Sequence, residues 1–284
     1  MREWYHGTMY FYYPREIATL NEGIACVLVL FVSILSSMIG IGGGTLYMPL
    51  LLVLGVPFHQ SALVSQFIIL VASLSATLVY GRARRVDWKL ALCIEPLTFT
   101  TAFIGGYFSS AVSVRMLKGV LALLLLSSGC LMLYPVHFLN DGGLLTGRRG
   151  WHRRFANREY QVNLAILMPV TALAGLLAGA EGISGGLLKV PAMVLLGDVP
   201  MDIAAATSAL MVTFTAATGL LGHLMAGRLN LALALPLAVI ASVGGHIGAQ
   251  LAPKVGRKWL RRVFAVVIIL IAGWLLWGVL VVEG

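Results

Sequence analysis

Eight apolar stretches, each close to the length of a membrane-spanning helix, constrain this chain more than any other feature. They cover residues 23–38, 61–80, 90–108, 117–134, 162–179, 204–225, 229–249 and 263–282. A helix crosses the hydrocarbon core of a bilayer with about 20 such residues. Because lipid offers the backbone no hydrogen-bond partners, only helices and closed barrels span it. The alternation of a barrel strand is absent from these stretches, so we predict an all-α, polytopic membrane helical bundle.

The composition agrees with this fold class and excludes several functions. Hydrophobic residues make up 59% of the 284 residues and charged residues only 11%, whereas soluble domains are about 25% charged. The sequence has a net charge of +9 but no motif that is typical of nucleic-acid binding. Cytoplasmic loops of membrane proteins are rich in Lys and Arg, and they explain this charge better. The cysteines lack metal-type or disulfide spacing, and the apolar stretches hold no nucleophile–base set. We therefore expect a multi-pass protein of the cell (inner) membrane, surrounded by lipid, with no enzymatic activity, cofactor, metal or nucleic-acid partner.

A cluster of glycines interrupts the apolar pattern at "GIGGGTLYMP", residues 40–49. Each glycine weakens a helix by about 1 kcal/mol relative to alanine, so the cluster indicates a break. The apolar run that follows, 45–54, would form a helix of about 15 Å, roughly half the thickness of the hydrocarbon core. The same pattern recurs as "GISGG" at 182–186, followed by the short apolar run 187–196.

The two glycine clusters belong to an internal repeat. "GGTLYMPLLLVLG" (43–55) aligns with "GGLLKVPAMVLLG" (185–197), and "FIGGYFS" (103–109) aligns with "HIGAQLA" (246–252) after one inserted residue. We therefore divide the chain into an N-terminal interfacial segment, 1–22, a first membrane repeat, 23–135, a cytoplasmic linker, 136–161, and a second membrane repeat, 162–282. Each repeat is expected to contain about four spans plus one short half-helix after its glycine break.

The distribution of basic residues predicts that the repeats are inverted relative to each other. The linker carries five arginines between 137 and 159, and other basic groups gather at 82–89 and 254–262. The basic groups at 82–89 and 254–262 lie at different positions in the alignment of the two repeats. If both groups and the linker are cytoplasmic, the two repeats must cross the membrane in opposite orientations. Both termini then lie outside. Inverted repeats are a common architecture of secondary transporters.

The glycine breaks predict an anion site between the repeats. A helix N-terminus presents free N–H groups and about half a positive charge, and glycines let a ligand approach that backbone. Two such ends meeting near the midplane would cradle an anion; the alternative is that the glycines only permit close helix packing. The candidate substrate-binding residues are Gly42, Gly43, Gly44, Thr45, Ser65, Gln66, Ser184, Gly185, Gly186, Lys189, Thr207 and Ser208.

Three ionisable residues lie at membrane depth, where such residues usually serve a function. Lys189, on the second half-helix, is expected either to contact the anion or to pair with Glu181. Glu181 either neutralises Lys189 or carries a proton that couples transport. Glu95 is expected to cap a helix or to pair with the arginines at 82–85.

The glycine-proline segments "GIGGGTLYMPLLLVLGVP" and "GISGGLLKVPAMVLLGDVP", with the "FIGGYFS" and "HIGAQLA" pair, resemble the sulfite exporter TauE/SafE family of membrane permeases. The resemblance extends over nearly the whole chain beyond residue 22. It implies transport of small sulfur-containing anions such as sulfite, sulfoacetate, related sulfonates or thiosulfate, usually outward. The glycines of both breaks match the family pattern, whereas Ser184 and Lys189 have no equivalent in the first repeat.

Together these observations predict a secondary transporter that exports such anions by alternating access around a midplane site. With a negative cell interior, an anion that leaves gains roughly 2.3 kcal/mol per charge per 100 mV, so export requires no coupling ion. Two alternatives stay open: a carrier or channel for another small anion, such as a carboxylate, or a membrane sensor that transports nothing. The sequence does not decide whether the protein forms a homo-oligomer.

Overall fold

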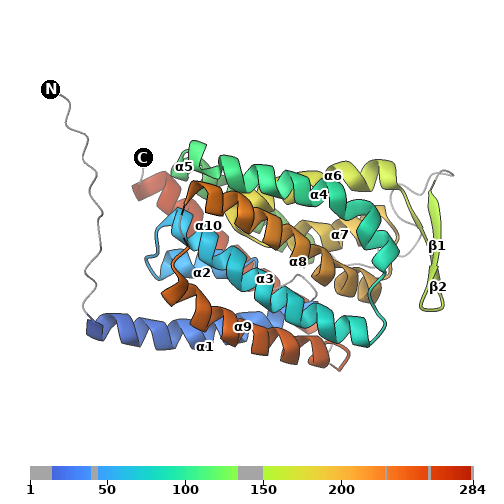
Figure 1. Ribbon diagram of the computed structural model, residues 1–284, viewed down its shortest axis with the longest axis horizontal. Coiled ribbons are helices and arrows are strands. Elements are labelled where there is room, and N and C mark those ends of the chain that lie inside the picture. The colour runs from blue at the N-terminus through green and yellow to red at the C-terminus, as the bar shows by residue number, and fades with distance from the viewer. Residues whose placement is uncertain (1–14, 40–43, 134–149, 228, 255–256, 283–284) are drawn as a thin grey trace.

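The computed structural model describes residues 15–39, 44–133, 150–227, 229–254 and 257–282 (Figure 1). The first half contains α1 (Arg15–Ile39), α2 (Tyr47–Val53), α3 (Phe58–Arg82), α4 (Trp88–Phe108), the 3-10 turn η1 (Ser109–Ala111) and α5 (Val114–Leu133). The second half contains strands β1 (Trp151–Phe155) and β2 (Arg158–Val162), α6 (Leu164–Glu181), α7 (Gly186–Leu196), α8 (Met201–Ala226), α9 (Leu231–Leu251), α10 (Arg257–Trp277) and the π-helical turn η3 (Gly278–Val282). The predicted helical bundle is confirmed.

The surface of the bundle is suited to lipid. Among the described residues, α3, α4 with η1, α6, α8 and α9 are long and apolar enough to cross a membrane. Large apolar side chains such as Leu123, Leu270 and Trp277 are mostly exposed on the outside of the helices. In water, contiguous apolar surface of this kind would favour aggregation, whereas in a bilayer it faces hydrocarbon.

The two halves run in opposite directions and are intertwined. In Figure 1, α1 begins at the left end of the bundle, whereas α6 begins at the right end, beside the β-hairpin. Helix α4 of the first half packs against α6 and α8, and its counterpart α9 packs against α1 and α3. The counterparts α3 and α8 also pack together, as do α5 and α10. The pairing is symmetric, as expected for inverted repeats, and neither half packs as a separate body.

Equivalent glycines allow these helices to cross closely. A Cβ atom on Gly105 of α4 would lie under 3.0 Å from the carbonyl oxygen of Leu176 on α6, and one on Gly248 of α9 would meet the carbonyl oxygen of Ile34 on α1 in the same way. Small residues permit such backbone contact between membrane helices. Close packing is therefore the role of these two glycines, which lie outside the breaks.

Each repeat contains its short helix. Helix α7 matches the predicted run closely, whereas α2 has only seven residues because residues 44–46 form a turn instead of its first turn of helix. Helix α6 ends at Gly182, which adopts φ +69°, a left-handed conformation suited to glycine. Helix α1 begins at Arg15, so the last part of the predicted interfacial segment 1–22 is helical; residues 1–14 lie outside the described part of the chain.

The linker contains a β-hairpin that the sequence analysis did not predict. Strands β1 and β2 pair antiparallel, with Phe155 opposite Arg158. The two turn residues, Ala156 and Asn157, have φ values of 49° and 58°, as type I′ hairpin turns require. Each strand has only five residues, and most of them are polar or charged. The sequence pattern of these strands is therefore weak. In Figure 1 the hairpin lies at the right, opposite the end where α1 begins and α10 ends.

A buried aspartate fastens this hairpin to the bundle. The Asp87 carboxylate caps α4 by accepting hydrogen bonds from N–H groups in the first turn of that helix. It also accepts hydrogen bonds from the Arg153 guanidinium and from the Tyr160 hydroxyl, the latter at 2.5 Å. Its own N–H donates to Thr207 of α8 at 3.0 Å. Burial alone would raise the pKa of Asp87, but the hydrogen bonds and the Arg153 charge outweigh it and hold the pKa below its ordinary value.

We expect Asp87→Asn to lower the free energy of unfolding by about 2 kcal/mol, because Arg153 loses a charge-assisted hydrogen-bonding partner while asparagine still caps α4. For a chain of this size the melting midpoint should fall by about 5 °C. Since the pKa of Asp87 is lowered by folding, its contribution is complete above the ordinary value of 3.8 and is lost as the pH falls through the folded value. The two proteins should therefore converge in strong acid.

The control is Glu159→Gln, on the same hairpin. Glu159 pairs with Arg154 at 3.6 Å, but both side chains are mostly exposed, so this substitution should leave the melting midpoint unchanged. Equal melting midpoints for Asp87→Asn and the unmodified protein at neutral pH would show that the hairpin is not fastened through Asp87.

Candidate functional site

The two glycine breaks meet in the centre of the bundle. Thr45, just before α2, and Ser184, just before α7, place their hydroxyl oxygens 3.2 Å apart. Both side chains are buried, with 0% and 2% exposed. A Cβ on Gly44 would lie 3.0 Å from Cβ of Ser184. Segments 139 residues apart thus touch across the two repeats. Gly42 and Gly43, which were also predicted to contribute, lie outside the described residues.

Helix α3 of the first repeat supports the break of the second. The Ser65 hydroxyl donates to the carbonyl oxygens of Gly182 and Ala62, and Gln66 Nε2 donates to the carbonyl oxygen of Ala178 at 3.0 Å. The Gly182 carbonyl follows the last turn of α6, where the helix no longer provides donors. The Ala178 carbonyl also accepts from the N–H groups of Gly182 and Ile183. The structure thus shows Ser65 and Gln66, which the sequence offers as candidate substrate-binding residues, bonding to the backbone of the other repeat.

The remaining predicted residues divide between the break and the hairpin end. Gly185 and Gly186 form the start of α7. Thr207 accepts the N–H of Asp87 and so belongs to the contact that holds the α3–α4 loop. Ser208 is fully buried, and its hydroxyl has no hydrogen-bond partner within the described part of the chain.

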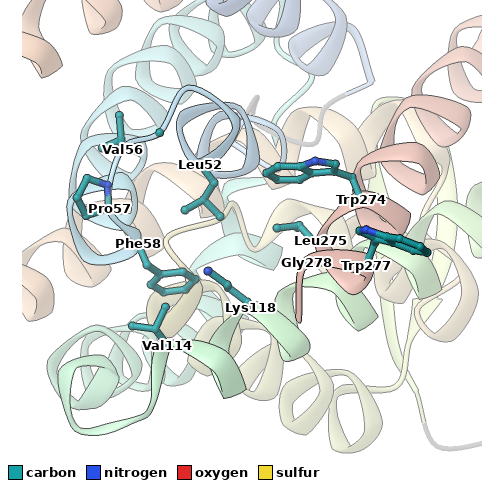
Figure 2. Close-up of a pocket in the computed structure, with 11 residues that line it drawn as sticks. Leu52, Val56, Pro57, Phe58, Val114, Lys118, Trp274, Leu275, Trp277 and Gly278 are labelled. Atoms are coloured by element: carbon teal, nitrogen blue, oxygen red, sulfur yellow. The ribbon is translucent and has the colours of Figure 1, made fainter. Parts of the chain in front are cut away.

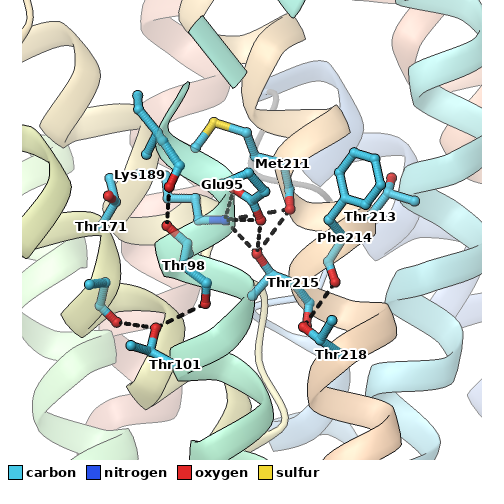
Figure 3. Close-up of polar contacts among 12 residues, drawn as sticks. Glu95, Thr98, Thr101, Thr171, Lys189, Met211, Thr213, Phe214, Thr215 and Thr218 are labelled. Atoms are coloured by element: carbon cyan, nitrogen blue, oxygen red, sulfur yellow. Dashed lines mark hydrogen bonds and ion pairs between the residues drawn. The ribbon is translucent and has the colours of Figure 1, made fainter. Parts of the chain in front are cut away.

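Lys189 forms a buried ion pair with Glu95 (Figure 3). Its Nζ lies 3.1 and 3.0 Å from the two carboxylate oxygens, and Thr215 Oγ1 accepts from the same Nζ at 2.5 Å. Thr215 in turn donates to Glu95 Oε1 at 2.6 Å. The expectation that Glu95 caps a helix or pairs with the arginines at 82–85 is wrong. Lys189 pairs with Glu95 and not with Glu181.

This ion pair connects the two repeats. Glu95 lies on α4 of the first repeat, and Lys189 and Thr215 lie on α7 and α8 of the second. At membrane depth an isolated charge is costly, so each group is stabilised by the other. Removing one partner of such a pair leaves an uncompensated buried charge. Sequence reasoning identified both ionisable residues but had no spacing signal that could choose between Glu95 and Glu181 as the partner, and nothing singled out Thr215.

Glu181, unlike Glu95, has no ion-pair or hydrogen-bond partner among the described residues. Its side chain is fully buried at the end of α6, and neither carboxyl oxygen has a hydrogen-bond partner among the residues that the structure describes. The same part of the chain contains no group of three or more His, Cys, Asp or Glu side chains that could hold a metal ion.

A cavity of about 380 Å³ lies at the end of the bundle away from the hairpin (Figure 2). Leu52 of α2 and Phe58 of α3 line one side, and Trp274 and Trp277 of α10 line the other. Lys118 of α5 is the one charged residue among those lining it. The cavity reaches the C-terminal end of α2, whereas the Thr45 and Ser184 side chains, where the breaks meet, are buried.

We expect Lys189→Met to lower the free energy of unfolding by about 3–5 kcal/mol, because Glu95 would remain as an unpaired buried charge. The double variant Lys189→Met/Glu95→Gln should recover most of this loss, since no charge then remains. Thermal melting of the purified proteins measures both effects, with Lys89→Met, a substitution at an exposed lysine, as the control. A double variant no more stable than the single one would contradict the pairing.

Comparison with known proteins identifies the family. The sequence model of the sulfite exporter TauE/SafE family matches residues 25–275. The chain is 31% identical over 263 residues to "Probable membrane transporter protein YunE" of Bacillus subtilis (strain 168), covering 87% of this chain and 94% of the relative. A probable membrane transporter protein of Methanocaldococcus jannaschii is 24% identical, with 81% and 86% covered.

A shorter match lies in a plant protein, and none lies among solved structures. "Sulfite exporter TauE/SafE family protein 1" of Arabidopsis thaliana is 34% identical over 109 residues, which are 37% of this chain and 24% of that protein. No solved structure matches the chain. The family match covers nearly all of the membrane bundle, including both glycine breaks and both short helices. The chain therefore belongs to the sulfite exporter TauE/SafE family of membrane transporters.

Proposed function

We propose that this transporter exports small sulfur-containing anions, such as sulfite or organosulfonates, by alternating access around the point where the two glycine breaks meet. The observation that carries the proposal is the 3.2 Å contact between Thr45 and Ser184 in the buried centre of the bundle. Interrupted backbone at membrane depth is tolerated where protein encloses it. In secondary transporters, such interruptions at the interface of inverted repeats form the substrate site.

The chemistry of this point suits an oxyanion. The start of α7 supplies N–H groups and the positive end of a helix dipole, and Thr45 and Ser184 supply hydroxyl donors. Gly44, Gly185 and Gly186 let the anion approach the backbone, and Gly42 and Gly43 are proposed to do so from the sequence alone. Ser65 and Gln66 act as supports for the break. Thr207 and Ser208 stay proposed contacts of lower rank, because Thr207 already serves the α3–α4 loop.

Lys189 favours a sulfur oxyanion over a carboxylate in this proposal. Its ammonium group is already neutralised by a carboxylate, that of Glu95, so an incoming anion has to compete with Glu95 for it. A dianion such as sulfite competes better than a monovalent carboxylate, because Coulomb attraction scales with charge. A carboxylate carrier, the alternative function, would gain little at this lysine.

The test is efflux from proteoliposomes that contain the purified protein. Sulfite and sulfoacetate, which both form dianions, should leave the vesicles faster than acetate, and Ser184→Val should slow this efflux at least about tenfold, equivalent to about 1.4 kcal/mol of lost interaction. The matched control is Ser127→Val, because Ser127 is exposed on α5 and bonds only within its own helix. Equal acetate efflux would favour the carboxylate carrier, and no efflux of any anion would favour a sensor.

We further propose that the hairpin and the linker 136–161 face the cytoplasm and that both ends of the chain face outward. The support is the arginine-rich linker together with the placement of the hairpin opposite the start of α1 and the end of α10 (Figure 1). In a cysteine-free variant of the protein, a single cysteine at Arg158 should react with a membrane-impermeant thiol reagent only after intact cells are opened. Reaction in intact cells would reverse the orientation.

A further inference from the structure

We propose that Glu181 is a proton-binding site whose proton crosses the membrane together with the transported anion. This proposal rests on the proposed function, since it names a second ion for the same transport cycle. Glu181 is the last residue of α6 and lies three positions before Ser184, at the break where the repeats meet. The ligand class is therefore a proton, held on a carboxyl group beside the anion site.

The surroundings of Glu181 differ from those of the other buried acids. Among the described residues, the buried acidic side chains are those of Asp87, Glu95 and Glu181. Asp87 accepts from Arg153, Tyr160 and backbone N–H groups, and Glu95 accepts from Lys189 and Thr215. Glu181 is 0% exposed, and neither of its oxygens has a donor within the part of the chain that the structure describes. The first two sites are built for an ionised carboxylate, and the third is not.

The charged groups on neighbouring elements do not compensate Glu181. Helix α7 brings Lys189 and α4 brings Glu95, but these two neutralise each other. Helix α8 brings His223, whose ring nitrogens bond the Gly179 carbonyl at 2.7 Å and Ser109 at 3.1 Å. Helix α3, which meets Gly182 through Ala62, brings Ser65 and Gln66 to the break, neither of which titrates. Its His59 and Arg82 lie at the two ends of the helix.

The remaining charged groups on elements that touch α6 belong to the surface. Lys89 of α4 and Arg115 of α5 are exposed, and Lys118 of α5 and Asp202 of α8 are partly exposed. An ionised Glu181 would therefore lack water, a donor and a counter-charge at once, which costs at least several kcal/mol. A protonated carboxyl group avoids most of that cost because it is neutral. This buried position thus accommodates Glu181 with its proton.

Proton and anion binding then reinforce each other. An anion at the breaks adds negative charge near Glu181, and two like charges in a low-dielectric site disfavour ionisation of the carboxyl group. When the site opens to one solution, the carboxylate takes up a proton and forms an O–H bond. When the site opens to the other solution, the same bond breaks and the proton leaves with the anion. The net charge moved per cycle falls by one, which reduces the effect of the membrane voltage.

The first experiment needs no substrate. Infrared spectra of the full-length protein in lipid at neutral pH should show the carbonyl stretch of a protonated carboxylic acid. Glu181→Gln should remove this band, and Glu159→Gln, on the exposed hairpin, should leave it unchanged. Glutamine is the neutral isostere of the protonated acid, so Glu181→Gln should fold and melt like the unmodified protein. A band unaffected by Glu181→Gln, or a variant that fails to fold, would overturn the proposal.

The second experiment counts protons during transport. Thiosulfate is the probe because it stays a dianion in the working pH range, so any proton that moves with it is carried by the protein. In voltage-clamped proteoliposomes, at a pH alkaline enough to remove the infrared band from the substrate-free protein, about one proton should accompany each thiosulfate, and the affinity should rise by up to about tenfold per unit fall in pH. Glu181→Gln should still move thiosulfate but without protons and with a flat pH dependence.

The outcomes separate this inference from the proposed function. Thiosulfate movement with the same proton count in Glu181→Gln would overturn the inference and leave the proposed function standing. Dependence on Na⁺ that disappears in Glu181→Gln would also overturn it, because the site would then hold a metal cation. Absence of sulfite and thiosulfate movement, with the infrared band still lost in Glu181→Gln, would overturn the proposed function and with it the coupling.

Discussion

A backbone that is interrupted inside a lipid bilayer has to find its hydrogen-bond partners within the protein, and the rest of this structure follows from that requirement. Residues 44–46 before α2 and 182–185 before α7 lie outside helices, and each of these segments contacts the other repeat. Helix α3 of the first repeat bonds the carbonyl groups at the end of α6, and Ser184 of the second repeat contacts Thr45 of the first. The intertwined packing of α4 and α9 with the opposite repeat keeps these contacts away from lipid.

The same intertwining decides where charge can be placed. Lys189 and Glu95 come from different repeats and form a neutral pair in the centre, whereas Asp87 and Arg153 form a second pair at the hairpin end. The first pair stabilises the interface where the substrate is proposed to bind. The second fastens the hairpin to the start of α4. Any movement that opens the centre to one solution has to rearrange contacts between repeats, so the bonds that stabilise the fold are also those on which alternating access would act.

Much of the fold could be predicted from residue patterns. The apolar stretches, the duplicated glycine-proline segments and the basic linker predicted the helices, the two short helices and the opposite direction of the repeats. Three features could not be predicted. The β-hairpin depends on two left-handed turn residues in a polar linker, α2 lost its first turn, and the partner of Lys189 is 94 residues away in sequence. Local patterns carry no information about a contact between residues so far apart in the sequence, because each is a single ionisable residue within an apolar stretch.

The sequence by itself determined that this chain enters a membrane, that its unit is duplicated and that both copies break at matching glycines, because hydrophobic length, repeat register and glycine content are local properties of the chain. The tertiary structure alone decided which charges meet. It paired Lys189 with Glu95, gave Asp87 its donors and gave Glu181 none among the described residues, because the energy of a buried charge depends on the atoms that surround it in space. That difference separates a stabilising ion pair from a group able to carry a proton.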